Sequence, residues 1–244
     1  MRKTMYLYGK NSVNERLGVN SRSIRKIFLQ DNFDDPRIIK KIKSLKIPHE
    51  QVTKKQLCRM KRADNLGGII AQVESFQYVS FEDLVYEPGN NKKTLIFLDR
   101  IYDPQNLGAI MRIAACFGGF AIVIPKHKAC SVTETVLHIA CGGENFVSVS
   151  MVSNISAALI QVKRCGYWVA GAIVQGGKDL SGVQLPQPLC LVLGSEGIGV
   201  RYGVCKHLDL SVSISMRGAP ISFNVTAAAA VFCYEISKQR NYSV

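Results

Sequence analysis

Three segments of the chain contain polar side chains that could act on a substrate. In residues 98–112, an apolar stretch is followed by a polar loop and a helical pattern that includes Asn106 and Arg112. These two residues are nearly two helical turns apart, so both could face one cleft. Taken alone, Asn106 would be interpreted as a helix cap. Arg112 lies between Met111 and Ile113 in an apolar row, where an arginine more often has an anionic partner such as phosphate.

The other two segments also begin where an apolar stretch ends. Residues 191–200 run from an apolar stretch into three glycines, with Glu196 among them. Glycines permit tight loops and a close approach of the backbone to a ligand. Residues 213–226 contain a loop after which Ser222 or Asn224 starts the final helix. In open α/β sheets, ligands bind beyond the carboxyl ends of the strands, so the three segments predict a binding site there.

Apolar runs and helical patterns alternate from Thr94 onward. The continuous apolar runs predict strands that are buried on both faces. They cover residues 95–98, 120–124, 146–149, 168–174, 189–193 and 208–214. Helical patterns cover residues 107–117, 133–140, 155–165 and 223–238. This alternation predicts an α/β fold in which helices cover both faces of a parallel sheet.

The first part of the chain predicts a second, smaller α/β domain. Short strands are expected at residues 6–8, 27–29 and 69–73, and helices at 13–17, 37–45 and 54–62. Asp35 and Pro36 suit the cap and the first position of the second of these helices. Residues 87–93 are polar and rich in turn formers. We therefore expect a small domain over residues 1–75, a linker over 76–93 and a larger α/β domain over 94–244 that contains the three segments.

The charge of the chain is concentrated in this small domain. The formal net charge is +13, and residues 1–65 hold 17 Lys/Arg against 6 Asp/Glu, a net +11. The rest of the chain holds 14 against 12, a net +2. Basic charge confined to one module is expected of a nucleic-acid binder, whereas a solvated basic surface without a partner is the plainer alternative.

The spacing of the cysteines and the length of the apolar runs indicate the cellular compartment of the protein. None of the eight cysteines lies in a CxxC pair, which argues against a zinc site and a disulfide framework, and we expect buried free thiols and no metal. No apolar run approaches the ~20 residues of a membrane helix, and the start of the chain has no apolar signal-peptide core. We therefore expect a cytoplasmic protein.

The three segments, in this order, resemble a known set of motifs. DPQNLGAIMR (residues 103–112), LGSEGIG (193–199) and ISMRGAPISFN (214–224) resemble the three signatures of the SpoU/TrmH class of RNA ribose 2′-O-methyltransferases, in the SPOUT superfamily. The resemblance spans residues 94–240. In addition, residues 8–13 and 65–69 resemble the two ends of the substrate-binding domain found in the ribosomal-RNA branch. Leu66 stands where that branch usually has Gln.

This resemblance implies a fold detail, a cofactor and an assembly. The parallel sheet would end in a trefoil knot that binds S-adenosyl-L-methionine (AdoMet). Gly194, Ile214 and Phe223 would contact AdoMet, largely through backbone groups. The partner would be RNA, and the protein would form a homodimer through the knotted domain, so that each site borrows residues from the partner.

The resemblance also implies a set of catalytic residues. Asn106, Arg112, Glu196, Ser222 and Asn224 match the catalytic positions of the class. A guanidinium does not readily lose a proton, so we expect Arg112 to bind RNA phosphate and stabilise developing alkoxide rather than act as a base. Asn106 and Asn224 would orient the ribose and Arg112, and Glu196 would position Arg112 or the substrate.

Several functions remain open at this point. The two-domain plan favours methylation of a guanosine ribose in large-subunit ribosomal RNA. A transfer-RNA ribose methyltransferase and a non-catalytic, ribosome-associated RNA-binding protein of the same fold are the alternatives. A nucleotide-dependent oxidoreductase would need a GxGxxG motif after the first strand, which the sequence lacks, and it would leave the basic domain unexplained.

Overall fold

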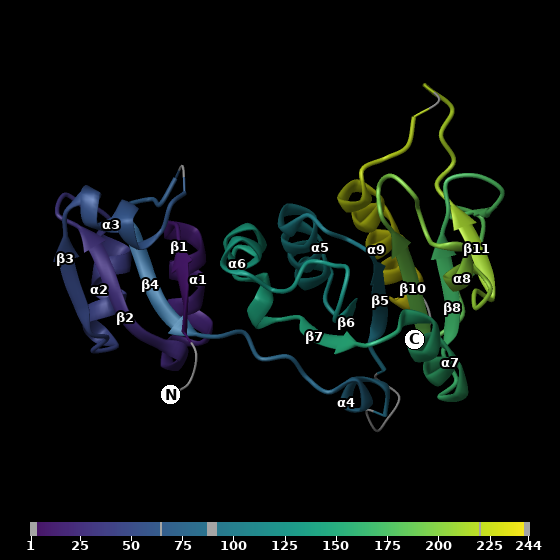
Figure 1. Cartoon of the computed structure of the whole chain (residues 1–244), viewed down its shortest axis with the longest axis horizontal. Helices are drawn as coiled ribbons and strands as arrows, with labels where there is room; N and C mark the ends of the chain where they lie inside the picture. Colours follow the sequence, from purple (N-terminus) through teal and green to yellow (C-terminus); the bar gives the residue numbers. More distant parts are fainter. Residues whose placement is uncertain (1–3, 64, 87–91, 220, 242–244) are drawn as a thin grey trace.

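The computed structural model describes residues 4–63, 65–86, 92–219 and 221–241. They form two sheets, one from each part of the chain, joined by an extended segment and a short helix (Figure 1). We call residues 4–74 the N-terminal module and residues 94–241 the C-terminal module.

The N-terminal module is a four-stranded sheet with helices on both faces. Its strands are β1 (Thr4–Tyr8), β4 (Ile69–Glu74), β2 (Ile24–Gln30) and β3 (His49–Val52), in that order across the sheet. Its helices are α1 (Lys10–Val19), α2 (Pro36–Ser44) and α3 (Lys54–Met60). The Asp35 side chain caps α2 as predicted, accepting a hydrogen bond from the backbone N–H of Ile38. Leu66 is buried beside Tyr8 and Leu57 under α3, which suits an apolar residue at that position.

The C-terminal module is built on a seven-stranded sheet in which every strand pair is parallel. The strands are β5 (Thr94–Asp99), β6 (Phe120–Pro125), β7 (Ser148–Val152), β8 (Trp168–Ala172), β9 (Lys178–Asp179), β10 (Leu189–Gly194) and β11 (Leu210–Ser213). Their order is β7-β6-β5-β10-β8-β11-β9. The predicted parallel sheet is confirmed.

Helices cover both faces of this sheet, also as predicted. They are α4 (Phe81–Val85), α5 (Pro104–Phe117), α6 (Glu134–Ala140), α7 (Ile155–Arg164), α8 (Tyr202–Cys205) and α9 (Val225–Asn241). Alternate residues of β5 are buried in two separate cores: Ile96 lies in a core with α5 and α9, and Phe97 lies in one with α4 and α7. Each such side chain contributes about 1.5–3 kcal/mol by leaving water, which explains the continuous apolar runs.

Several element boundaries differ from the predicted ones, including three in the C-terminal module. Helix α5 begins at Pro104 with Asp103 as its cap, so Asn106 lies inside the first turn. Strand β7 begins two residues later than predicted because a 3-10 turn, η2 (Gly143–Asn145), precedes it and leaves Phe146 61% exposed. Helix α9 begins at Val225, after Asn224.

The cysteines are free, but most of them are not buried. Only Cys190 and Cys233 are fully buried, whereas Cys58 and Cys116 are exposed and the other four are intermediate. The prediction of buried thiols is therefore wrong for most of these residues, because several lie on the outer faces of their helices. No helix within the described residues is long and apolar enough to cross a membrane.

Candidate active site at the carboxyl edge of the sheet

A cavity of about 430 Å³ opens where β8, β10 and β11 end. Its walls come from the ends of these strands and the loops after them, together with the start of α9. The lining residues of the loops are 172–174, 193–200, Ile214, Met216, Ser222 and Phe223. The predicted cofactor residues Gly194, Ile214 and Phe223 all line this cavity, and so do Glu196 and Ser222. The volume lies within the range of small-molecule sites. Two of the three segments singled out in the sequence, 191–200 and 213–226, therefore contribute residues to one cavity, whereas no residue of 98–112 lines it.

A glycine is required at position 194, where the backbone folds back on itself. An added Cβ at Gly194 would lie 2.0 Å from the carbonyl carbon of Gly199 and 2.1 Å from the amide nitrogen of Val200. The turn is closed by a hydrogen bond from the Gly199 N–H to the Ser195 carbonyl, 2.7 Å, and Gly199 has a φ of 70°. The cavity wall here is thus backbone, which suits the predicted backbone contacts.

Asp99 and Arg201 fasten this loop to the sheet. Asp99 is fully buried at the end of β5, and its carboxylate accepts bonds from Arg201 Nε at 2.8 Å and from the Arg201 backbone N–H at 3.1 Å. The Asp99 carboxylate raises the pKa of Arg201. Neither residue was predicted from the sequence, although an aspartate that ends an apolar strand was the available signal.

Three of the predicted catalytic residues meet at the mouth of the cavity. Glu196 Oε1 accepts hydrogen bonds from Asn106 Nδ2 at 2.8 Å and from Asn224 Nδ2 at 2.5 Å. Asn224 also caps α9, because its Oδ1 accepts from the backbone N–H of Thr226 at 2.7 Å. Glu196 Oε2 has no hydrogen-bond partner among the described residues and is free to accept one from a substrate.

Arg112 lies apart from this group. It is exposed on α5 and does not line the cavity. No ion pair joins Arg112 to Glu196 within the described ranges. The side-chain contacts of Glu196 are with the amides of Asn106 and Asn224. Ser222 lines the cavity and is exposed, and Asn224 takes the capping role that Ser222 could have filled.

The cavity suits a nucleoside that carries a positive charge. Its apolar side chains include Ile173, Met216 and Phe223, against which a base can pack. Among the described lining residues, the one charged side chain is that of Glu196, which is acidic. AdoMet has an adenosine part and a cationic sulfonium, and no described lining residue carries a positive charge that would repel the sulfonium. The residues present therefore fit this cofactor.

The fold and the cavity define an α/β enzyme with a cofactor site at the carboxyl edge of a parallel sheet. The chain belongs to the SpoU rRNA Methylase family, whose model matches residues 93–234. A second family model, described as RNA 2′-O ribose methyltransferase substrate binding, matches residues 6–79.

Individual proteins are similar over almost the full length. A putative TrmH family tRNA/rRNA methyltransferase, YacO of Bacillus subtilis, is 33% identical, covering 97% of this chain and 96% of its own. The 23S rRNA (guanosine-2′-O-)-methyltransferase RlmB of Nitrosomonas europaea is 31% identical over 99% and 94% of the two chains. The solved structure of the SpoU methyltransferase AviRb from Streptomyces viridochromogenes with AdoMet has a TM-score of 0.80 at 18% identity, covering 98% and 91%.

The chain is accordingly an RNA 2′-O-ribose methyltransferase that uses AdoMet as its methyl donor. When bound, AdoMet supplies an electrophilic methyl carbon on its sulfonium. What remains for the residues of this chain is to bind the RNA, orient one ribose hydroxyl and receive or stabilise the charge that develops on its oxygen.

Proposed function

We propose that the substrate is a guanosine ribose in large-subunit ribosomal RNA. The observation that carries this proposal is that relatives named 23S rRNA (guanosine-2′-O-)-methyltransferase align with 96–99% of the chain, and so with most of the basic N-terminal module as well. Residues 1–75 then form the RNA-holding domain, 76–93 the linker and 94–244 the catalytic domain. The free thiols favour a reducing compartment, and we place the reaction in the cytoplasm.

Each polar residue at the cavity has a distinct role in this proposal. Asn106 and Asn224 hold one oxygen of Glu196, which leaves Oε2 to accept a hydrogen bond from the ribose hydroxyl. Glu196 thereby orients the nucleophile toward the cofactor, whose contacts are Gly194, Ile214 and Phe223.

Two further residues complete the proposed site. Ser222, at the rim of the cavity, contacts the substrate. Arg112 binds an RNA phosphate and stabilises the charge that develops on the attacking oxygen. A cationic side chain that is exposed and unpaired within the described part of the chain is available for both tasks.

The position of Arg112 supports a site shared by two copies of the chain. Arg112 does not line the cavity of its own chain, so a second copy would bring its Arg112 to the first copy's cavity. Helices α5 and α9 also present exposed apolar side chains, Phe117 (39%), Val231 (38%) and Tyr234 (59%), which suit burial in a dimer. The proposed assembly is a homodimer.

The path of the C-terminal segment supports a trefoil knot. Strand β11 lies beyond β8, whereas α9 packs against α5 and β10 on the other side of the cavity. Between them, Ile214, Met216, Ser222 and Phe223 line the cavity together with the loop 193–200. We propose that it threads this loop. If the chain is unfolded by pulling its two ends, a knotted chain stays shorter than its contour length, whereas full extension would contradict the knot.

Mapping of ribose methylation tests the substrate. We compare RNA from cells with and without the protein. In cells that lack it, we expect one guanosine of large-subunit ribosomal RNA to lack its 2′-O-methyl group. Purified protein with AdoMet should restore the group on unmodified ribosomal RNA. A site that appears in transfer RNA instead would overturn the ribosomal proposal and favour the tRNA alternative, while an unchanged map in both assays would contradict both.

A substitution tests the role of Arg112. Arg112→Ala should lower methylation by about 10²–10³-fold, because a charge that stabilises the reacting oxygen is lost. AdoMet affinity, measured by calorimetry, should not change. Arg164→Ala is the matched control, since Arg164 is exposed on α7, a helix of the opposite core. Full activity of Arg112→Ala would refute this role.

A further inference from the structure

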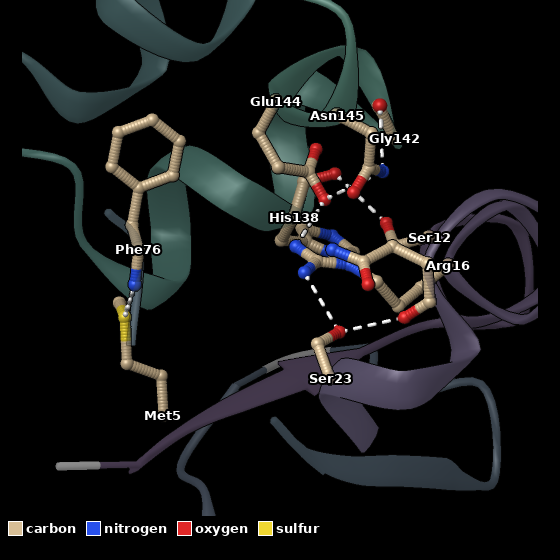
Figure 2. Close-up of polar contacts among 10 residues, drawn as sticks. Met5, Ser12, Arg16, Ser23, Phe76, His138, Gly142, Glu144 and Asn145 are labelled. Atoms are coloured by element: carbon tan, nitrogen blue, oxygen red, sulfur yellow. Dashed lines mark hydrogen bonds and ion pairs between the residues drawn. The ribbon is translucent and has the colours of Figure 1, made fainter. Parts of the chain in front are cut away.

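A buried ion pair joins the two modules. Arg16 of α1 and Glu144 of η2 are 6% exposed each, and Arg16 Nη2 lies 2.9 Å from Glu144 Oε1. Figure 2 shows the guanidinium of Arg16 between Glu144 and Ser23, whose hydroxyl accepts from Nη1 at 3.2 Å. The two residues are 128 positions apart in sequence. The contact therefore fixes one module against the other.

The same segment of the C-terminal module carries two more links to the N-terminal module. Glu134, at the start of α6, pairs with Lys61 at 2.6 Å and accepts from the backbone N–H of Tyr6 at 2.7 Å. The ring of His138 stacks on Tyr8 at 4.2 Å between ring centroids and also contacts the Tyr8 carbonyl through Nδ1. Helix α6 and η2 together form the docking surface for the N-terminal module.

The opposite side of α6 and η2 packs on the helix that carries Arg112. A Cβ added at Gly108 of α5 would lie 2.7 Å from Ile139 Cβ and 2.9 Å from the Val136 carbonyl oxygen, so α5 and α6 touch at their backbones. A Cβ added at Gly143 would lie 3.0 Å from the Cα of Arg112. Gly143 therefore contacts the turn of α5 that contains Arg112, and the next residue in the sequence, Glu144, pairs with Arg16.

The chemistry of the pair argues against simple adhesion. Arg16 Nε and Glu144 Oε2 are buried without a hydrogen-bond partner in the described structure, which lowers the stability gained from the contact. Apolar side chains of similar size would join two surfaces at least as firmly. What a charged, directional contact adds is one defined orientation.

We infer that Arg16 and Glu144 are positioning residues, which set the orientation of the RNA-holding module relative to Arg112. The inference rests on the proposed role of Arg112. An RNA bound to the N-terminal module meets Arg112 in the correct register because α6 and η2 connect the two rigidly. Neither residue lines the AdoMet cavity, so the effect is confined to RNA and to the reacting hydroxyl.

The test replaces both charges with neutral side chains of similar shape, in Arg16→Met/Glu144→Gln. We expect kcat for RNA methylation to fall at least 10-fold, AdoMet affinity to stay within 2-fold, and small-angle scattering to show a more extended particle. Arg16→Lys, which keeps the charge, should have a kcat between those of the double variant and the wild type. Lys163→Met, which removes an ion pair within the C-terminal module, is the control and should keep kcat.

Two outcomes would overturn the inference. One is wild-type kcat in the double variant, and the other is a loss of kcat that is matched by an equal loss of AdoMet affinity. If the double variant does not fold, Glu134→Gln tests the same docking surface at a partly exposed position, where unchanged kcat counts against the inference. Arg112→Ala in the same assay separates the two proposals: if it loses activity while the double variant keeps wild-type kcat, the role of Arg112 stands and the inference about Arg16 and Glu144 alone fails.

Discussion

Glu196 has a defined place because two amides from distant parts of the chain donate to one of its oxygens. The donors are 90 and 28 residues away in sequence. The motifs indicated Asn106, Glu196 and Asn224 individually. Their mutual contact arises where the first turn of α5, the loop 193–200 and the start of α9 meet, which residue spacing does not encode. Asp99 was missed for the same reason, since its partner Arg201 lies 102 residues away.

Removing the charge of Glu196 tests its proposed role. In Glu196→Gln the side-chain oxygen still accepts from Asn106 and Asn224, so thermal unfolding should be unchanged. The methylation rate should fall by about 10²-fold, because the neutral amide orients and activates the hydroxyl less well. Single-turnover methylation measures the change. Glu82→Gln, at an exposed carboxylate on α4, serves as the control, and equal rates in the two variants would contradict the role.

The burial of the cysteines predicts their reactivity. Burial raises the pKa of the Cys233 thiol to about 12 and that of Cys190 well above its ordinary value, so at pH 8 almost none of either is the reactive thiolate. A colorimetric thiol reagent should label Cys58 and Cys116 quickly and should label Cys190 and Cys233 only on unfolding. Peptide mapping after labelling identifies the sites. Early labelling of Cys233 in the folded protein would count against the fold of α9.

At the scale of elements, the apolar pattern predicted the strands and helices that carry the site, and most of its errors concern where these elements begin and end. The pattern placed the start of α5 at Leu107, because the polar first turn formed by Pro104 and its neighbours has no apolar periodicity. The short strand β9 was also unpredicted. Its residues, Lys178 and Asp179, are polar and pair only with β11 at the edge of the sheet. Such features depend on tertiary contacts that a local pattern does not contain.

The loop 193–201 depends on its attachment to β5. In Asp99→Asn, the new amide nitrogen faces N–H donors of Arg201, so the loop loses hydrogen bonds and a buried charge pair. We expect about 2 kcal/mol less free energy of unfolding, at the low end for such pairs because Arg201 is partly exposed. AdoMet affinity should fall about 10-fold. Urea unfolding and calorimetry measure both, and an unchanged affinity would show that the loop does not need this anchor.

At the scale of the whole molecule, the charge count alone separates a basic module from a nearly neutral one. It does not reveal that the two modules share a buried seam at α6 and η2, because Arg16 counts as one of many basic residues in the sequence. Burial distinguishes it: Arg16 is 6% exposed, whereas Arg25 and Lys26 form ion pairs at the surface of the same module.

The proposed homodimer predicts the effect of a charge on α9. In Tyr234→Glu, a charge would be buried in the dimer interface, so the protein should become a monomer and lose most of its methylation activity. Light scattering coupled to size exclusion measures the mass. Tyr86→Glu, at a tyrosine that is 62% exposed and lies outside the α5–α9 surface, should stay dimeric. A fully active Tyr234→Glu monomer would contradict a shared site.

Gly108 and Gly194 have no side chain that could take part in catalysis, but both lie at close contacts. Gly108 lies where α5 touches α6, and Gly194 lies where the backbone of the loop 193–200 folds back on itself. Even the smallest substitution at either glycine displaces the catalytic helix or the cofactor loop. The shape of the site therefore depends on the absence of a side chain at these two positions as well as on the polar side chains around the cavity.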